Sequence, residues 1–92
     1  MEINYNRLPE HMRDGFRLYI EHGIPGGSFM NAVLSNDLIG AFGRADDINR
    51  DRLFDTCCFL RNEAPAGCYG SPDRVREWIR DGGLVGLTKE HS

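Results

Sequence analysis

Apolar residues recur at helical spacing along most of the chain. In the first such run, large apolar side chains stand three or four positions apart, opposite a charged face: Met12, Phe16, Tyr19 and Ile20. This pattern is typical of an amphipathic helix. Pro9 suits the first helical position, and Gly23 suits the residue that ends a helix. We therefore expect a helix over residues 9–22.

The same spacing predicts three further helices. The first of them, over residues 28–42, starts at Ser28, whose hydroxyl can cap a helix N-terminus. The next, over residues 46–62, starts at adjacent aspartates, whose charge suits that end of a helix. The last, over residues 72–81, follows Ser71 and has proline in its first turn. Since no strand pattern is longer than about four residues, the sequence predicts an all-α fold, a small bundle of about four helices.

The two middle helices are expected to face the core with their apolar stripes. The stripe of the helix over 28–42 consists of Phe29, Met30, Val33, Leu34, Leu38, Ala41 and Phe42. The stripe of the helix over 46–62 consists of Leu53, Phe54, Cys57, Cys58 and Leu60.

The length fits one domain, residues 1–92, with residues 1–8 as a polar lead-in and residues 88–92 as a tail. A chain this short buries a modest core that oligomerisation would help to stabilise, so we expect a homo-oligomer. Before the tail, three apolar side chains are available to pack back on the domain: Leu84, Val85 and Leu87.

Two Gly/Pro-rich loops, over residues 22–29 and 63–72, connect these helices. In a simple up-down bundle both loops lie at one end. That end would collect the candidate ligand-binding residues, which are His22, Pro25, Gly26, Gly27, Ser28, Phe29, Arg61, Asn62, Tyr69, Ser71 and Arg74. Helix N-termini bind anions, arginine neutralises phosphate charge, and an aromatic ring stacks on a base. The two loops therefore predict a site for a phosphate-bearing ligand such as a cyclic or linear nucleotide.

The apolar residues in these loops leave three interpretations open. They close the end of the bundle, form an interface with a protein or a second copy, or line a ligand pocket. The Gly26-Gly27-Ser28 stretch is also what a plain helix cap requires, and the P-loop pattern is absent.

Charge narrows the classes of function. A formal net charge of −3 argues against broad binding to nucleic-acid backbone. All but one of the 11 basic residues are arginine, which favours anion recognition or ion-paired interfaces, although a GC-rich genome produces the same excess. Asp47, Asp51 and Asp55 form an acidic row, but no second element completes a metal site. We therefore expect a solvated acidic face, with no metal and no cofactor.

Catalytic and membrane patterns are weak or missing. The three cysteines, Cys57, Cys58 and Cys68, lack zinc spacing, so we expect reduced and mostly buried thiols. His22 could act as a base for Ser28 or Cys68, but no third group supports it, and a histidine at a helix C-terminus also suits the helix dipole. We expect no enzyme. With no membrane-spanning stretch and no signal-peptide pattern, we expect an intracellular protein.

The two loop sequences resemble those of a group of small, largely uncharacterised proteins of tailed bacteriophages and prophages. The matching stretches are His22-Gly23-Ile24-Pro25-x-Gly27-Ser28-Phe29 and Asn62-Glu63-Ala64-Pro65-x-Gly67-Cys68-Tyr69-Gly70-Ser71-Pro72-Asp73. The likeness spans roughly residues 8–82. Relatives often have proline in place of Gly26 and tryptophan in place of Tyr69, changes that keep the loop rigid or aromatic.

This resemblance implies a phage context, in which small acidic proteins include factors that counteract host defences. We therefore expect a non-catalytic binding protein of this kind, acting in the cytoplasm of the infected bacterium. It would sequester a nucleotide signal at the two-loop end. The alternative is an inhibitor or accessory factor that binds a host or phage protein directly. A third class, a small hydrolase, would need His22 or Cys68 to react.

Overall fold

The computed structural model describes residues 3–90, with the side chains of residues 89 and 90 left aside. All regular structure in this part of the chain is helical, as the spacing predicts. The elements are α1 (Glu10–His22), α2 (Ser28–Leu34), α3 (Leu38–Arg44), α4 (Asp47–Asp51), α5 (Leu53–Asn62), the 3-10 turn η1 (Ala66–Cys68), α6 (Pro72–Asp81) and α7 (Gly83–Glu90). The predicted small all-α bundle is confirmed.

α1 matches the first predicted helix to within one residue, with Pro9 as its N-cap instead of its first helical residue. Gly23 ends it in the left-handed conformation, with φ 70°, and its N–H bonds to the Leu18 and Tyr19 carbonyls. This turn also touches the one between α6 and α7, because a Cβ on Gly23 would lie 2.9 Å from the Gly83 nitrogen. Glycine is therefore needed here for both conformation and space.

The helix predicted over residues 28–42 is two helices, α2 and α3. The break falls at Asn36, which has φ 66°, and at Asp37, whose carboxylate accepts the Gly40 N–H and caps α3. Asparagine and aspartate compete with a helix by bonding to nearby backbone, so they favour such ends. Ser28 is the first residue of α2 and makes no cap, because Gly27 takes the N-cap position without a side-chain hydrogen bond.

The helix predicted over residues 46–62 is also divided, into α4 and α5. Its predicted start is correct, since Asp46 caps α4 by accepting the Asn49 N–H at 2.7 Å. The division falls at Arg52, whose φ of −110° and ψ of 19° leave the helical range. The Arg52 guanidinium bonds to the Arg7 carbonyl and to Asp55, which ties the division to the N-terminal segment.

The last predicted helix is α6, and a further helix follows it. Ser71 caps α6 by accepting the Arg74 N–H, and Gly82 ends α6 with φ 80°. α7 then continues over residues that the sequence assigns to a packing segment and a tail. Leu84 and Leu87 pack on the core as expected, whereas Val85 is 40% exposed. Residues 88–90 are helical, and residues 91 and 92 lie outside the described residues.

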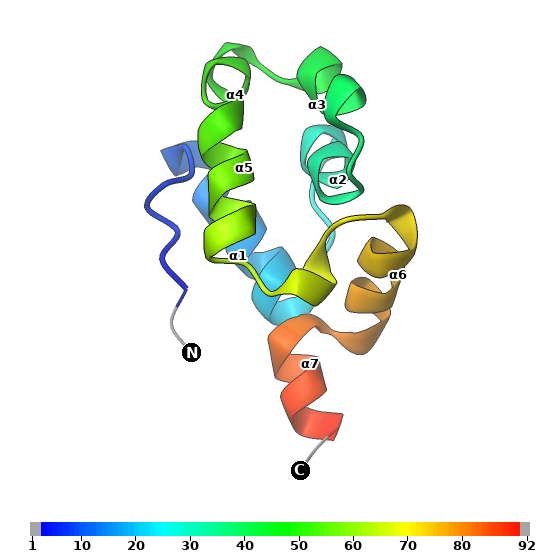
Figure 1. Ribbon diagram of the computed structural model, residues 1–92. Helices are drawn as coiled ribbons and strands as arrows, with labels where there is room; N and C mark the ends of the chain where they lie inside the picture. The colour runs from blue at the N-terminus through cyan, green and yellow to red at the C-terminus, as the bar shows by residue number, and fades with distance from the viewer. Residues whose placement is uncertain (1–2, 91–92) are drawn as a thin grey trace.

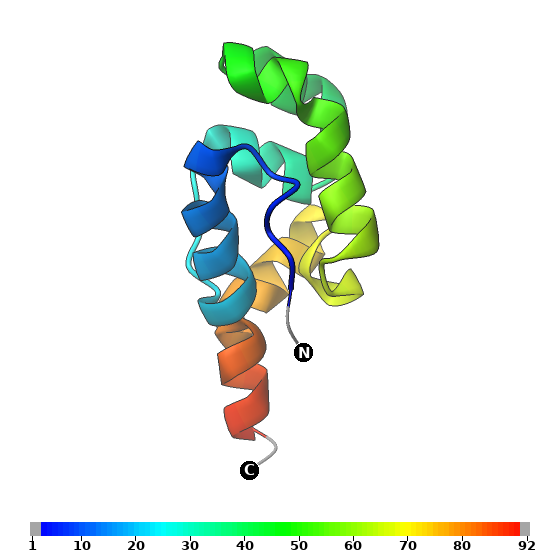
Figure 2. The ribbon, with the colours of Figure 1, turned by 90° about the vertical axis from the view of Figure 1, so that its left-hand side faces the viewer.

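α1 makes contacts to most of the other helices. Phe16 of α1 packs edge-on against Phe59 of α5, with ring centroids 5.9 Å apart. α2 crosses α1, and its Met30 Sδ lies 3.8 Å from where a Cβ on Gly15 would stand. Trp78 of α6 bonds to the α1 backbone. α3 and α4 lie at the end of the molecule away from α7 (Figures 1 and 2).

Candidate functional site

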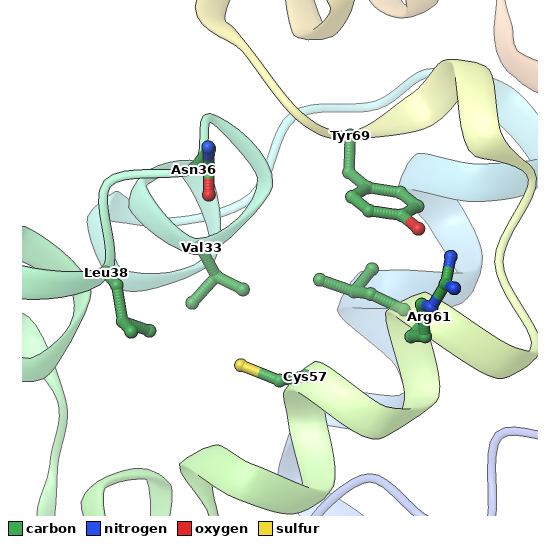
Figure 3. A pocket seen from close by; sticks show the side chains of 7 residues that line it. Val33, Asn36, Leu38, Cys57, Arg61 and Tyr69 are labelled. Carbon is green, nitrogen blue, oxygen red and sulfur yellow. The ribbon is translucent and has the colours of Figure 1, made fainter.

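A pocket of about 210 Å³ lies between the α2–α3 break on one side and α5 on the other (Figure 3). Most of its wall is apolar. The α2–α3 side contributes Val33, Asn36 and Leu38, α5 contributes Cys57, Leu60 and Arg61, and the second loop contributes Tyr69. Sites for drug-sized ligands usually measure about 300–1,000 Å³, so this pocket has room for one large side chain and not for a whole nucleotide.

Two hydrogen bonds to its backbone hold the second loop against this pocket. The Gly70 N–H donates to the Leu34 carbonyl at 2.7 Å, which fastens the loop to the C-terminal end of α2. Two residues earlier, the Tyr19 hydroxyl donates to the Cys68 carbonyl at 2.7 Å, in a buried bond from α1. Tyr69 stands between these two attachments, so its ring is placed at the pocket by the core itself.

Among the side chains that the structure describes, those of residues 3–88, Arg61 is the one arginine that has no hydrogen bond or ion pair. The others pair with aspartates or with backbone carbonyls. In Figure 3 the Arg61 guanidinium lies beside the Tyr69 hydroxyl at the edge of the pocket. The pocket thus combines an apolar wall with a solvent-exposed cation that is available to an anion.

The thiols near this region are not activated. Burial, and secondarily the neighbouring Cys58, raises the pKa of the Cys57 thiol, which lines the pocket. Burial raises the pKa of the Cys68 thiol to about 12. With this pKa, Cys68 is protonated at neutral pH. Only a thiolate is a competent nucleophile, so Cys68 lacks the reactivity that a hydrolase would need from it.

The predicted site residues of the second loop and its flanks are only partly brought together. Arg61 and Tyr69 line the same pocket. Arg74 does not line the pocket and instead donates to the backbone of the second loop, since its Nη1 lies 3.4 Å from the Tyr69 carbonyl oxygen. Ser71 serves as the cap of α6, and Asn62 is the exposed last residue of α5, outside the pocket.

None of the predicted first-loop residues lines this pocket. Five of them are exposed elsewhere: His22, Pro25, Gly26, Gly27 and Ser28. Phe29 is 7% exposed and belongs to the core, so its ring is closed to a stacking base. The simple up-down order is not adopted. Figure 2 shows the first loop running back beside α1 to α2, which lies across it.

The two loops attach to opposite ends of α2. Gly27 precedes its first residue, Ser28, while Gly70 is bonded to its last residue, Leu34. A helix of 7 residues is about 10 Å long. A single ligand that touched both Ser28 and Ser71 would have to bridge that distance.

Large apolar side chains are exposed around the pocket, and sequence periodicity assigned several of them to the core. Ile39 is 84% exposed and Phe54 is 74% exposed. On α5, Phe54 stands three and seven positions before Cys57 and Arg61, so it continues the stripe that faces the pocket. We call the exposed apolar residues of α3 and α5 the α3–α5 face; they are Leu38, Ile39, Phe42 and Phe54.

These exposures correct the predicted core. Leu38 and Phe42 have the helical spacing of core residues, but α3 follows the break at Asp37 and buries only Ala41. Phe54 has the same spacing, but it lies on the side of α5 away from the buried Thr56 and Phe59. The Ser35-Asn36-Asp37 run was the signal in the sequence that could have located the first break.

Three comparisons, with protein families, curated proteins and solved structures, find no match to this chain. Among residues 3–90, no group of three His, Cys, Asp or Glu side chains is arranged to hold a metal ion. No helix in this part of the chain has the length and apolar character needed to cross a membrane.

Proposed function

We propose that this protein is a small, phage-encoded, non-catalytic binding protein that counteracts a host defence by direct contact with another protein. The phage context and the cytoplasm of the infected bacterium come from the resemblance of the two loop sequences. The observation that carries direct protein contact is the α3–α5 face, where large apolar side chains are exposed beside an apolar pocket.

The size of this face supports a protein partner. With about 200 Å² for a fully exposed large apolar side chain, the four residues expose on the order of 500 Å². Apolar surface of this extent is often functional, and a stable interface buries about 800 Å² per partner. The exposed apolar area of the α3–α5 face therefore approaches that of a small interface, with a defence protein or with a second copy.

A nucleotide signal remains the second candidate because Arg61 lies beside the Tyr69 ring. A cation and an aromatic ring at one edge suit a phosphate and a base. The pocket of about 210 Å³ is too small to enclose a nucleotide, so most of the ligand would lie outside it. Protein contact therefore has the stronger support.

The test combines affinity capture with a defence assay. The native protein and the Ile39→Glu, Phe54→Glu and Val85→Glu variants are expressed during infection, the last as a matched control on α7. We expect the native chain and the Val85→Glu variant to capture the same protein and to protect the phage, and the other two to lose both. Circular dichroism melting checks whether each variant is folded.

Two further measurements separate the candidates. Light scattering gives the molar mass of each variant and so tests self-association. Heat release from the purified protein recovers any bound nucleotide. A recovered nucleotide, together with full protection by the Phe54→Glu variant, would replace protein contact with nucleotide sequestration.

A further inference from the structure

We infer that the pocket between the α2–α3 break and α5 is an anchor site for an acidic–apolar segment of the partner protein. A large apolar side chain of that segment fills the cavity, and a carboxylate next to it pairs with Arg61. This inference rests on the proposed function and specifies the chemistry that the partner presents.

The cavity would bind the apolar side chain of the partner segment. Val33, Leu38 and Leu60 supply carbon surface from three elements, and the raised pKa of Cys57 keeps its thiol neutral. A space of about 210 Å³ suits one side chain of the size of leucine or phenylalanine. Burying such a side chain removes apolar surface from water on both partners, which favours association.

The polar edge of the pocket would bind the carboxylate of the partner segment. Arg61, Tyr69 and Asn36 are the polar side chains that line the pocket, and within residues 3–90 none of them has a side-chain hydrogen bond. No acidic residue lines the pocket, although the chain as a whole has a net charge of −3. An unpaired guanidinium beside the Tyr69 hydroxyl is complementary to the two oxygens of a carboxylate, while Asn36 lies on the opposite wall of the pocket (Figure 3).

The orientation of the segment follows from α5. Because Phe54, Cys57 and Arg61 share one stripe, a segment with its carboxylate at Arg61 and its side chain in the cavity continues over Phe54. Phe54 is 74% exposed and would be covered by the rest of the partner. The pocket therefore fixes the register, and the α3–α5 face supplies the remaining contact area.

Three small probes test this inference on the full-length, ¹⁵N-labelled protein by NMR titration. N-acetyl-L-leucine carries both the apolar side chain and the carboxylate. N-acetyl-L-leucinamide has the same side chain without the charge, and N-acetylglycine has the charge without the side chain. We expect saturable shifts at pocket residues, with N-acetyl-L-leucine binding about three- to fivefold more tightly than either of the others.

The Arg61→Gln variant removes the cation, and Arg76→Gln removes an exposed arginine of α6 as a matched control. We expect Arg61→Gln to abolish the advantage of the acid over the amide and Arg76→Gln to keep it. Arg61→Lys retains the positive charge, so we expect it to retain most of the tighter binding of the acid relative to the amide. Both glutamine variants change exposed side chains, so their spectra should retain the native dispersion.

Equal binding of acid and amide to the native protein would overturn the role of Arg61, and shifts confined to other regions would overturn the pocket. These outcomes are distinguishable from failure of the proposed function. If the probes fail while Phe54→Glu still loses the captured protein, protein contact stands and only the anchor is rejected. If the probes bind while no protein is captured through this face, the anchor chemistry stands and the protein-contact function is rejected.

Discussion

The indole Nε1–H of Trp78 donates to the carbonyl oxygen of Tyr19 at 3.0 Å, in a buried bond that joins α6 to α1. The same N–H lies 3.2 Å from the Ile20 carbonyl, so it is shared between two consecutive residues of α1. Tyr19 in turn donates its hydroxyl to the Cys68 carbonyl. One turn of α1 thus fixes both α6 and the loop that carries Tyr69.

Substituting Trp78→Phe is expected to lower the free energy of unfolding by about 2–3 kcal/mol, because it removes this donor and leaves part of the indole volume empty. Urea denaturation followed by circular dichroism measures this, since Trp78 is the only tryptophan and the variant has no indole fluorescence. The exposed Glu77→Gln variant is the control and should unfold like the native protein. A loss below about 0.5 kcal/mol would show that the bond contributes little.

Substituting Gly83→Ala is expected to lower the free energy of unfolding by at least about 2 kcal/mol. Gly83 has φ 68°, and a Cβ there would lie 2.6 Å from the Gly23 nitrogen, so the new methyl group meets rigid backbone in a strained conformation. Calorimetry should show a drop in Tm of about 10 °C. Gly43→Ala is the matched control: nothing lies within 4 Å of its Cβ and it lies inside α3, so its Tm should hold or rise slightly.

Substituting Asp37→Ala is expected to cost about 1 kcal/mol, because its carboxylate caps α3 by accepting the Gly40 N–H at 3.0 Å. The loss should appear first as faster amide exchange within α3. Asp51→Ala changes another exposed aspartate that caps no helix, and it should leave the exchange of α3 unchanged. Equal effects of the two variants would refute the capping role.

The protein should become less stable at alkaline pH. In the folded chain burial raises the pKa of Cys68 from 9.0 to about 12, so the unfolded thiol ionises first. This contribution to stability is fully present below pH 9.0 and falls as the pH rises towards 12, by up to about 1.4 kcal/mol per pH unit. Burial raises the pKa of Tyr19 as well, which adds a further loss above pH 10.

Urea titrations between pH 7 and pH 10.5 measure this slope. Cys68→Ala should flatten the part that begins near pH 9.0, whereas Cys58→Ala, at a partly exposed thiol, should keep it. A native slope that Cys68→Ala leaves unchanged would assign the alkaline loss to other groups.

Local signals in the sequence located most helix ends. The glycine at position 23, the Asp46 cap and the Ser71-Pro72 start all act through neighbouring backbone, so they can be recognised without a fold. The breaks at Asn36 and Arg52 were missed because apolar spacing continues across both. Periodicity describes a stripe, but it does not show whether the helix beneath it is continuous.

The candidate site was predictable only in part. Arg61 and Tyr69 were selected from the sequence because their chemistry suits an anion and a ring. Val33, Leu38 and Cys57 were assigned to the core, since an apolar residue on a helical stripe has the same sequence signature in a core and in a pocket wall. The direction of α2 across α1 decides which of these it is, and that direction depends on long-range packing such as Met30 against Gly15.

The helix breaks at Asn36 and Arg52 also bound a segment that is expected to unfold locally. Residues 38–51 bury only Ala41, Ala45 and Asn49, so they have few buried apolar side chains that resist local unfolding. Amide hydrogens there should exchange with solvent well before those of α1. A partner that covers Ile39 and Phe54 would slow this exchange without touching α1, so the protection pattern of residues 38–51 reports binding to the α3–α5 face.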